Sequence, residues 1–135
     1  MNRTSLHHGQ VIQAGSEIRA GFPSPAESYM EEVFDLNERL IQHPAATFLV
    51  QVCGDSMIGA GIHHGDKLIV DRSLKPGDGK IVVANLEGEF VVKRLRIQGN
   101  RISLLSENPH FKTLEIGPEN QFEIWGVVTY SIHSV

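Results

Sequence analysis

The sequence predicts a small, mainly β domain of antiparallel strands, with one short helical segment near the N-terminus and a flexible N-terminal arm. Three observations support this fold class. From Thr47 onward, short β-prone runs alternate with turns that contain glycine or proline, whereas only one earlier stretch has helical spacing. The first part of the chain has no periodicity. At 135 residues, the chain is long enough for one domain with its own core.

Residues 1–26 are predicted to form the arm and residues 27–135 the folded domain. The arm is rich in Ser, Gly, Gln and Pro, and Pro23-Ser24-Pro25 near its end favours an extended backbone. An ordinary flexible terminus has the same composition, so these residues by themselves assign the arm no role.

Residues 26–43 are predicted to be the helical segment. Its apolar side chains recur at helical spacing, at Met30, Val33, Leu36, Leu40 and Ile41. Asp35 and Glu38 have the spacing of a capping box, which allows a break into two short helices near Asp35. The His43-Pro44 pair ends the segment.

The rest of the chain is predicted to form strands over residues 48–53, 67–71, 80–86, 89–97, 101–106 and 121–132. The third and fourth of these make a hairpin about Glu87-Gly88, since glycine supplies the positive φ that tight turns need. The last run, around residues 123–132, fits either an edge strand open for pairing or a core strand.

Ser56 is the candidate nucleophile. It lies in Gly54-Asp55-Ser56-Met57, directly after the 48–53 run, and Gly54 and Gly59 allow the backbone to expose its hydroxyl to a substrate. A serine hydroxyl needs a neighbouring base to take its proton. That base is usually histidine, but lysine can serve where a dry pocket lowers its pKa.

Lys93 is the candidate base. Period-two alternation in the 89–97 run places it on the same face as Val91, Leu95 and Ile97. An ammonium group on an apolar face is unfavourable unless it is paired or deprotonated. The same pattern also fits a lysine that extends to the edge of the sheet, with Ser56 as an ordinary turn serine.

Histidine and metal chemistry have less support. None of the seven histidines follows an aspartate by three residues, the pattern of lipase-like Gly-Asp-Ser hydrolases. The sequence has no His-x-x-x-His pair, and its single cysteine, Cys53, cannot build a structural zinc site or an intramolecular disulfide. We therefore expect no metal and no cofactor, and we expect Cys53 to be a small buried core residue.

Three segments in order carry a resemblance to a known family: Gly54-Asp55-Ser56-Met57, residues 65–71 (GDKLIVD) and residues 88–95 (GEFVVKRL). Together they resemble the LexA/UmuD family of self-cleaving serine peptidases, and the likeness runs from about residue 20 to about residue 130. The resemblance implies a LexA-like peptidase fold with a Ser56–Lys93 dyad, in which neutral Lys93 takes the proton of Ser56.

The resemblance also implies that the chain cuts itself within the arm. In this family the cut bond joins a small residue to glycine upstream of the domain, and Ala20-Gly21 matches that pattern. A small side chain followed by glycine suits a narrow cleft in which the substrate backbone approaches the nucleophile closely. Ala14-Gly15 is a second such pair, and spacing alone does not choose between them, but the Phe-Pro-Ser-Pro context favours Ala20-Gly21.

Only twenty residues precede Gly21, too few for the helical DNA-reading domain of a repressor, so the likeness points to the UmuD branch. It then implies the SOS DNA-damage response, in which a RecA–single-stranded DNA filament stimulates the cut. The shortened homodimer would act as accessory subunit of an error-prone Y-family (UmuC-like) translesion DNA polymerase. The alternative is an interaction module of the same fold, such as a phage or repressor-type relative, with cleavage lost or secondary.

Composition limits the other partners. A net charge of -4 argues against direct sequence-specific DNA binding, because phosphate contacts need clustered Lys and Arg. The first twenty residues lack an apolar core segment, and no apolar run approaches the length of a membrane span. With a single cysteine, these features lead us to expect a cytoplasmic protein that does not bind membranes.

Overall fold

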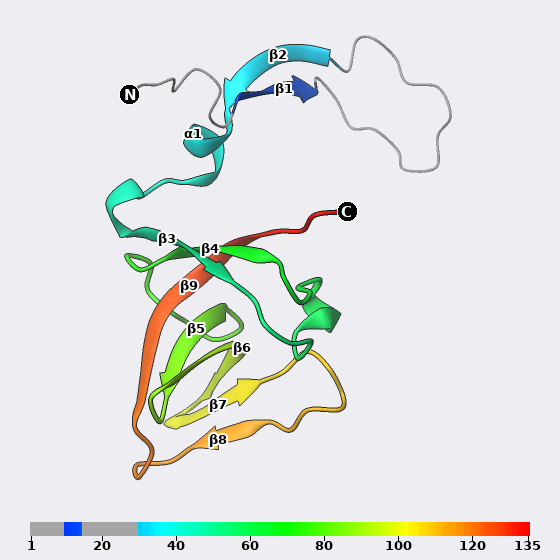
Figure 1. Cartoon of the computed structure of the whole chain (residues 1–135). Coiled ribbons are helices and arrows are strands. Elements are labelled where there is room, and N and C mark those ends of the chain that lie inside the picture. The colour runs from blue at the N-terminus through cyan, green and yellow to red at the C-terminus, as the bar shows by residue number, and fades with distance from the viewer. Residues whose placement is uncertain (1–9, 15–29) are drawn as a thin grey trace. The chain divides into compact units, whose positions relative to one another are not determined.

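The computed structural model describes residues 10–14 and 30–135, which belong to two compact units, Met1–Gln42 and His43–Val135. In the first unit, β1 (Gln10–Ala14) pairs antiparallel with β2 (Met30–Asp35), which continues into the short helix α1 (Leu36–Leu40). The second unit is built on one sheet (Figure 1). The expected boundary between arm and domain, after residue 26, lies outside the described residues.

The sheet of the second unit has seven strands, paired antiparallel in the order β3-β4-β9-β5-β6-β7-β8. The strands are β3 (Thr47–Gln51), β4 (Lys67–Asp71), β5 (Ile81–Leu86), β6 (Glu89–Gln98), β7 (Arg101–Leu105), β8 (Leu114–Ile116) and β9 (Phe122–Ile132). Short 3-10 turns occupy Pro44–Ala46 and Ile58–Ala60. For the described residues, the predicted fold class, mainly β and antiparallel with one short helix, is confirmed.

Strand β9 connects the two halves of the sheet (Figure 1). Its first half pairs with β5, from Phe122 to Val127, and its second half pairs with β4, from Val127 to Ile132. A side chain at Gly126 would lie 2.6 Å from Val70 Cγ1, so glycine permits this close crossing. Of the two positions that the sequence allowed for this strand, the structure shows the interior one.

The predicted hairpin between β5 and β6 is confirmed. Glu87 and Gly88 both have positive φ, 53° and 84°, as a two-residue turn of this kind requires. The side chain of Asn85 accepts a hydrogen bond from the backbone N–H of Gly88 at 3.0 Å and fixes the turn. This hairpin sets the register of β6 and therefore the direction of its lysine.

The predicted helix over residues 26–43 is wrong for most of its described length. Residues 30–35 form β2, because they pair with β1, a segment distant in sequence that local spacing cannot reveal. The helix covers only Leu36–Leu40, and the predicted break at Asp35 is confirmed: its side chain accepts a hydrogen bond from the Asn37 backbone at 3.0 Å. Besides β2, two further strands, β1 and β8, were not predicted.

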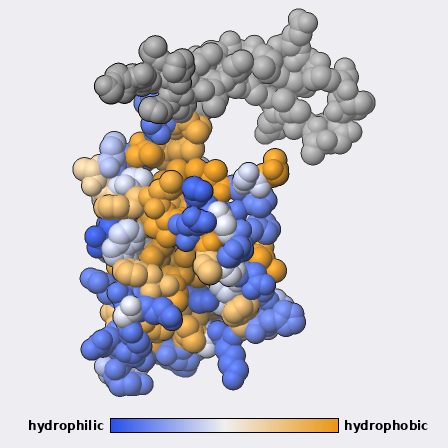
Figure 2. Space-filling model, viewed as in Figure 1, coloured by the Kyte–Doolittle hydropathy of each residue, from blue (hydrophilic) through white to orange (hydrophobic). Residues whose placement is uncertain are grey.

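The surface of the sheet unit carries several large hydrophobic side chains. Figure 2 shows hydrophobic surface in the middle of one face of this unit, with hydrophilic residues toward its lower end in this view. The exposed large hydrophobic side chains include Phe48, Leu49, Phe90, Phe111 and Tyr130. No helix in the described part of the chain combines the length and hydropathy that crossing a bilayer requires.

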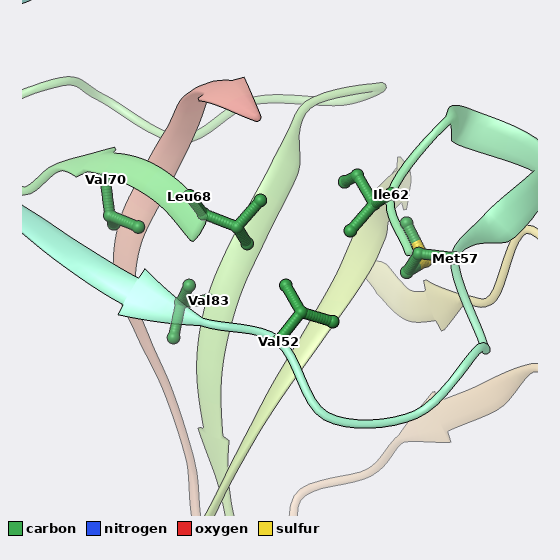
Figure 3. Close-up of a cluster of buried hydrophobic side chains, with 6 residues drawn as sticks. All are labelled: Val52, Met57, Ile62, Leu68, Val70 and Val83. Atoms are coloured by element: carbon green, nitrogen blue, oxygen red, sulfur yellow. The ribbon is translucent and has the colours of Figure 1, made fainter. Parts of the chain in front are cut away.

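The core comprises two clusters that meet along β5. Val83 points into one cluster, while its neighbours Val82 and Ala84 point into the other, as alternation along a strand requires. The first cluster brings together side chains from β4, β5 and the segment that follows β3 (Figure 3): Val52, Met57, Ile62, Leu68, Val70 and Val83. Met57 is 2% exposed, and burying such a side chain contributes about 1.5–3 kcal/mol. The core therefore anchors the residue next to Ser56.

Candidate active site

Ser56 lies in the turn that follows β3. Gly54 has a φ of 94°, which favours glycine at that position, and its N–H donates to Nδ1 of His64 at 2.9 Å. On the other side of Ser56, Met57 is buried in the core. The turn is therefore held on both sides of the serine, whose side chain remains partly exposed.

A second segment, Glu107-Asn108, supports the same turn. The Glu107 N–H donates to the Ser56 carbonyl at 2.8 Å, and the Gly59 N–H donates to the Glu107 carbonyl at 2.7 Å. The buried side chain of Asn108 donates to the Asp55 carbonyl at 3.0 Å. A Cβ at Gly59 would lie 2.5 Å from the Glu107 carbonyl oxygen, which is too close, so only glycine permits this approach of the two segments. These contacts fix the backbone of Ser56.

Lys93 is buried on β6, with 9% of its surface exposed. Its Nζ donates to Ser106 Oγ at 2.8 Å and lies 5.6 Å from the centre of the Phe111 ring. Burial lowers the pKa of Lys93 below its ordinary value, because the charged ammonium loses hydration. Within the described residues, no carboxylate lies at salt-bridge distance from this amine. Alternation placed Lys93 on the same face of this strand as Leu95, and the structure shows both side chains buried.

Ser56 and Lys93 line the same pocket, which has a volume of about 370 Å³. Hydrophobic side chains form much of its wall: Val50, Val52, Val83, Phe90, Val91, Val92 and Phe111. Such walls exclude water and favour the neutral form of an amine. The predicted cleavage residues Ala20 and Gly21 lie outside the described residues, as does Gly15, whereas Ala14 is the last residue of β1.

The expectation that Cys53 is buried is wrong. Strand β3 ends at Gln51, so the regular alternation stops there, and Val52 takes the core position while Cys53 is exposed. Cys53 is one of the residues that line the pocket containing Ser56 and Lys93. Its thiol can therefore be alkylated to test the role of that pocket.

If the chain cuts itself as the family resemblance implies, we expect a bulky maleimide on Cys53 to slow that cut at least about tenfold, because the adduct displaces the peptide from the attacking position. The reagent is selective, since Cys53 is the chain's only cysteine. The measurement is the cleavage rate before and after alkylation, with Cys53→Ser as the matched control that cannot react. An alkylated protein that cleaves at the unmodified rate would show that the peptide binds elsewhere.

Sequence reasoning did not find Ser106, the hydrogen-bond partner of Lys93. The residue follows β7, and the register between β6 and β7, in which Arg94 pairs with Leu105, brings it beside Lys93. A single serine after a strand gives no local signal, because its role depends on strand pairing.

A group of possible metal ligands lies outside this pocket. In the described part of the chain, His63, Asp66 and His133 place one ligand atom each within 4.8 Å of one another. Asp66 accepts hydrogen bonds from the His63 backbone at 2.8 Å and contacts His133 Nδ1 at 2.6 Å. The His63 hydrogen bond lowers the pKa of Asp66, and His133 adds to this effect. The carboxylate is thus already satisfied by hydrogen bonds.

Comparison with known proteins decides the family. Residues 10–129 match the family described as Peptidase S24-like. The chain belongs to this family. It is 53% identical to the protein SamA of Salmonella typhimurium strain LT2 over 84% of this chain and 79% of that protein.

Two further relatives of this Peptidase S24-like chain extend the comparison. The protein MucA of Escherichia coli is 47% identical over 85% of this chain and 79% of its own length. The LexA repressor of Photorhabdus laumondii is 38% identical over 77% of this chain and 51% of the repressor. The resemblance to the LexA/UmuD family is therefore confirmed, and the family is one of peptidases.

Proposed function

We propose that the protein is a serine endopeptidase that cuts its own chain, with Ser56 as nucleophile and Lys93 as general base. One observation carries the proposal: a buried lysine with a lowered pKa, bonded to a neutral hydroxyl, lines the same pocket as a serine in a rigid turn. This is the environment in which a lysine can accept the proton of a serine. Membership of a peptidase family supports it.

The proposed reaction has two steps. In the first, neutral Lys93 accepts the Ser56 proton while Oγ bonds to the Ala20 carbonyl carbon, and the ammonium then protonates the leaving Gly21 nitrogen as the C–N bond breaks. In the second, water attacks the acyl ester and gives a proton to Lys93, which returns it to the departing Ser56 oxygen. Backbone N–H groups of the Ser56 turn are the natural donors to the oxyanion.

We assign the cut to Ala20-Gly21, within an arm of residues 1–26 that precedes the peptidase domain of residues 27–135. Sequence context supports this bond over Ala14-Gly15. The structure adds that Ala14 pairs with Met30 between β1 and β2, so a cut after Ala14 would require that pairing to open. A peptidase cleft binds an extended chain whose backbone is free to enter it.

We further propose that the cut serves the SOS DNA-damage response in the cytoplasm. In this proposal a RecA–single-stranded DNA filament stimulates cleavage, and the processed homodimer joins a Y-family polymerase as its accessory subunit. The support is the likeness of the three motifs to the UmuD branch, together with the relatives SamA and MucA, which match most of this chain.

The test is the intact mass of the purified protein after incubation at neutral and alkaline pH, with and without RecA filaments. We expect loss of residues 1–20 and a new N-terminus at Gly21. A new N-terminus at Gly15 would move the cut to the other Ala-Gly pair and overturn the assigned bond. An unchanged mass in every condition would overturn the peptidase assignment.

An interaction module is the second candidate, and exposed aromatic side chains favour it. The Trp125 ring lies 5.2 Å from Phe48 and 6.1 Å from Phe90, with Arg72 over its face at 4.6 Å. Phe48 and Phe90 are both about half exposed, at 45% and 58%. Aromatic and arginine side chains are typical of protein interfaces. Polymerase binding by a Ser56→Ala protein at the wild-type affinity would support this function independently of cleavage.

A further inference from the structure

The hydrogen bond between Lys93 and Ser106 constrains the orientation of the lysine amine. A neutral amine has one lone pair and two N–H bonds, and it acts as a base only when the lone pair points at the hydroxyl it deprotonates. The four-carbon lysine side chain rotates freely unless something holds its end. Here Nζ donates to Ser106 Oγ at 2.8 Å, which fixes one of its N–H bonds.

Ser106 begins the same segment that supports the nucleophile. The next residue, Glu107, bonds through its backbone to Ser56 and Gly59, and Asn108 bonds to Asp55. These three consecutive residues therefore contact both parts of the site. The Ser106 side chain bonds to Lys93, while Glu107 and Asn108 bond to the turn that contains Ser56. A shared support of this kind sets the separation and the relative orientation of two reacting groups.

We propose that Ser106 is a positioning residue of this site: its hydroxyl accepts a hydrogen bond from Lys93 and so directs the lysine lone pair toward Ser56. The proposal rests on the proposed function. A hydroxyl suits the task because it carries no charge, whereas a carboxylate at this place would hold Lys93 as an ammonium and remove the base. The burial of Lys93 leaves water little access to replace this partner.

Other ionisable groups near Lys93 could also affect its titration. The other ionisable side chains that line the pocket are Cys53 and Asp55, from the serine turn. Glu107, next to Ser106, is paired with Arg94 at 3.1 Å and is partly exposed. A Ser106 variant leaves all four groups in place, so a change in the titration of Lys93 reports the lost hydroxyl.

The experiment is the rate of self-cleavage against pH for Ser106→Ala, Ser106→Thr and Ser103→Ala. Ser103 is the matched control, because it lies on β7 and its hydroxyl bonds to Glu115 at 3.0 Å instead of to Lys93. For Ser106→Ala we expect the plateau rate to fall about ten- to a hundredfold, since the lone pair is no longer aimed.

We also expect the midpoint of the Ser106→Ala profile to move to lower pH, because the ammonium loses an acceptor that favoured it. Ser106→Thr keeps the hydroxyl and should restore both features, and Ser103→Ala should match the wild type. A merely structural defect would let water reach Lys93 and move the midpoint to higher pH. That outcome, or an unchanged profile, would overturn the role of Ser106.

A second measurement separates this proposal from the peptidase assignment. In a Ser56→Ala background, the ¹³Cε resonance of Lys93 reports its titration without any cleavage, and adding Ser106→Ala should lower its midpoint. If Ser56→Ala still cuts itself, the proposed dyad fails, whatever Ser106 does. If Ser56→Ala is inactive but Ser106→Ala leaves the titration midpoint of Lys93 unchanged, only the positioning role of Ser106 is overturned.

Discussion

The Lys93→Met protein is expected to fold at least as stably as the wild type and to lose self-cleavage by a factor of about a thousand or more. Methionine matches the length of lysine and removes an amine that is unfavourable to bury on an apolar face. Without a base, the Ser56 hydroxyl keeps its proton and does not attack. The measurements are the thermal midpoint and the fraction of cut chain over time.

Three further variants test this result. Lys93→Arg keeps a cation at the site but cannot deprotonate, so it should be as inactive as Lys93→Met. Lys67→Met removes an exposed lysine from β4 and should cut at the wild-type rate. Ser56→Ala should be inactive with an unchanged fold. Retained cleavage in any Lys93 or Ser56 variant would contradict the dyad.

Self-cleavage is expected to accelerate from neutral pH toward about pH 10, rising about tenfold per pH unit until Lys93 is neutral. Burial lowers the pKa of Lys93, so the plateau should begin below its ordinary value of 10.5. The check is a series of single-turnover rates across this range. A rate that is flat or falls as the pH rises would remove Lys93 as the base.

The same pKa shift has a defined effect on stability. Between the folded pKa of Lys93 and 10.5, the unfolded chain binds more protons at this position than the folded chain does. The contribution of Lys93 to the free energy of unfolding therefore rises with pH in that window. Alkaline pH thus favours both the active protonation state and, through this group, the folded state, so a faster cut there does not require loosening of the fold.

The parts of the site that follow from local pattern were predictable. Alternation along β6 placed Lys93 on an apolar face, and the structure shows it buried there. The glycine-bounded turn after β3 placed Ser56 at a strand end. Both inferences need only the period of a strand and the conformational freedom of glycine.

Features that depend on contacts between distant segments were not predictable. Residues 30–35 have helical spacing but form β2, because pairing with β1 outweighs local preference. Cys53 was predicted to be buried, but it is exposed because β3, and with it the regular alternation, ends at Gln51. Ser106 gained its partner from the register of β6 and β7. In each case the deciding interaction joins residues that a short window of sequence does not contain together.

The position of β9 in the chain has a consequence for timing during synthesis. The turn that contains Ser56 follows β3, which pairs with β4, whereas Lys93 belongs to the β5–β6 hairpin. The strand that pairs with both β4 and β5 is β9, which is the last strand of the sheet in the sequence. A chain growing from the ribosome therefore contains both reactive residues well before the strand that joins their halves. We therefore expect the proposed cut in the arm, which is synthesised before both reactive residues, to occur only after β9 is complete.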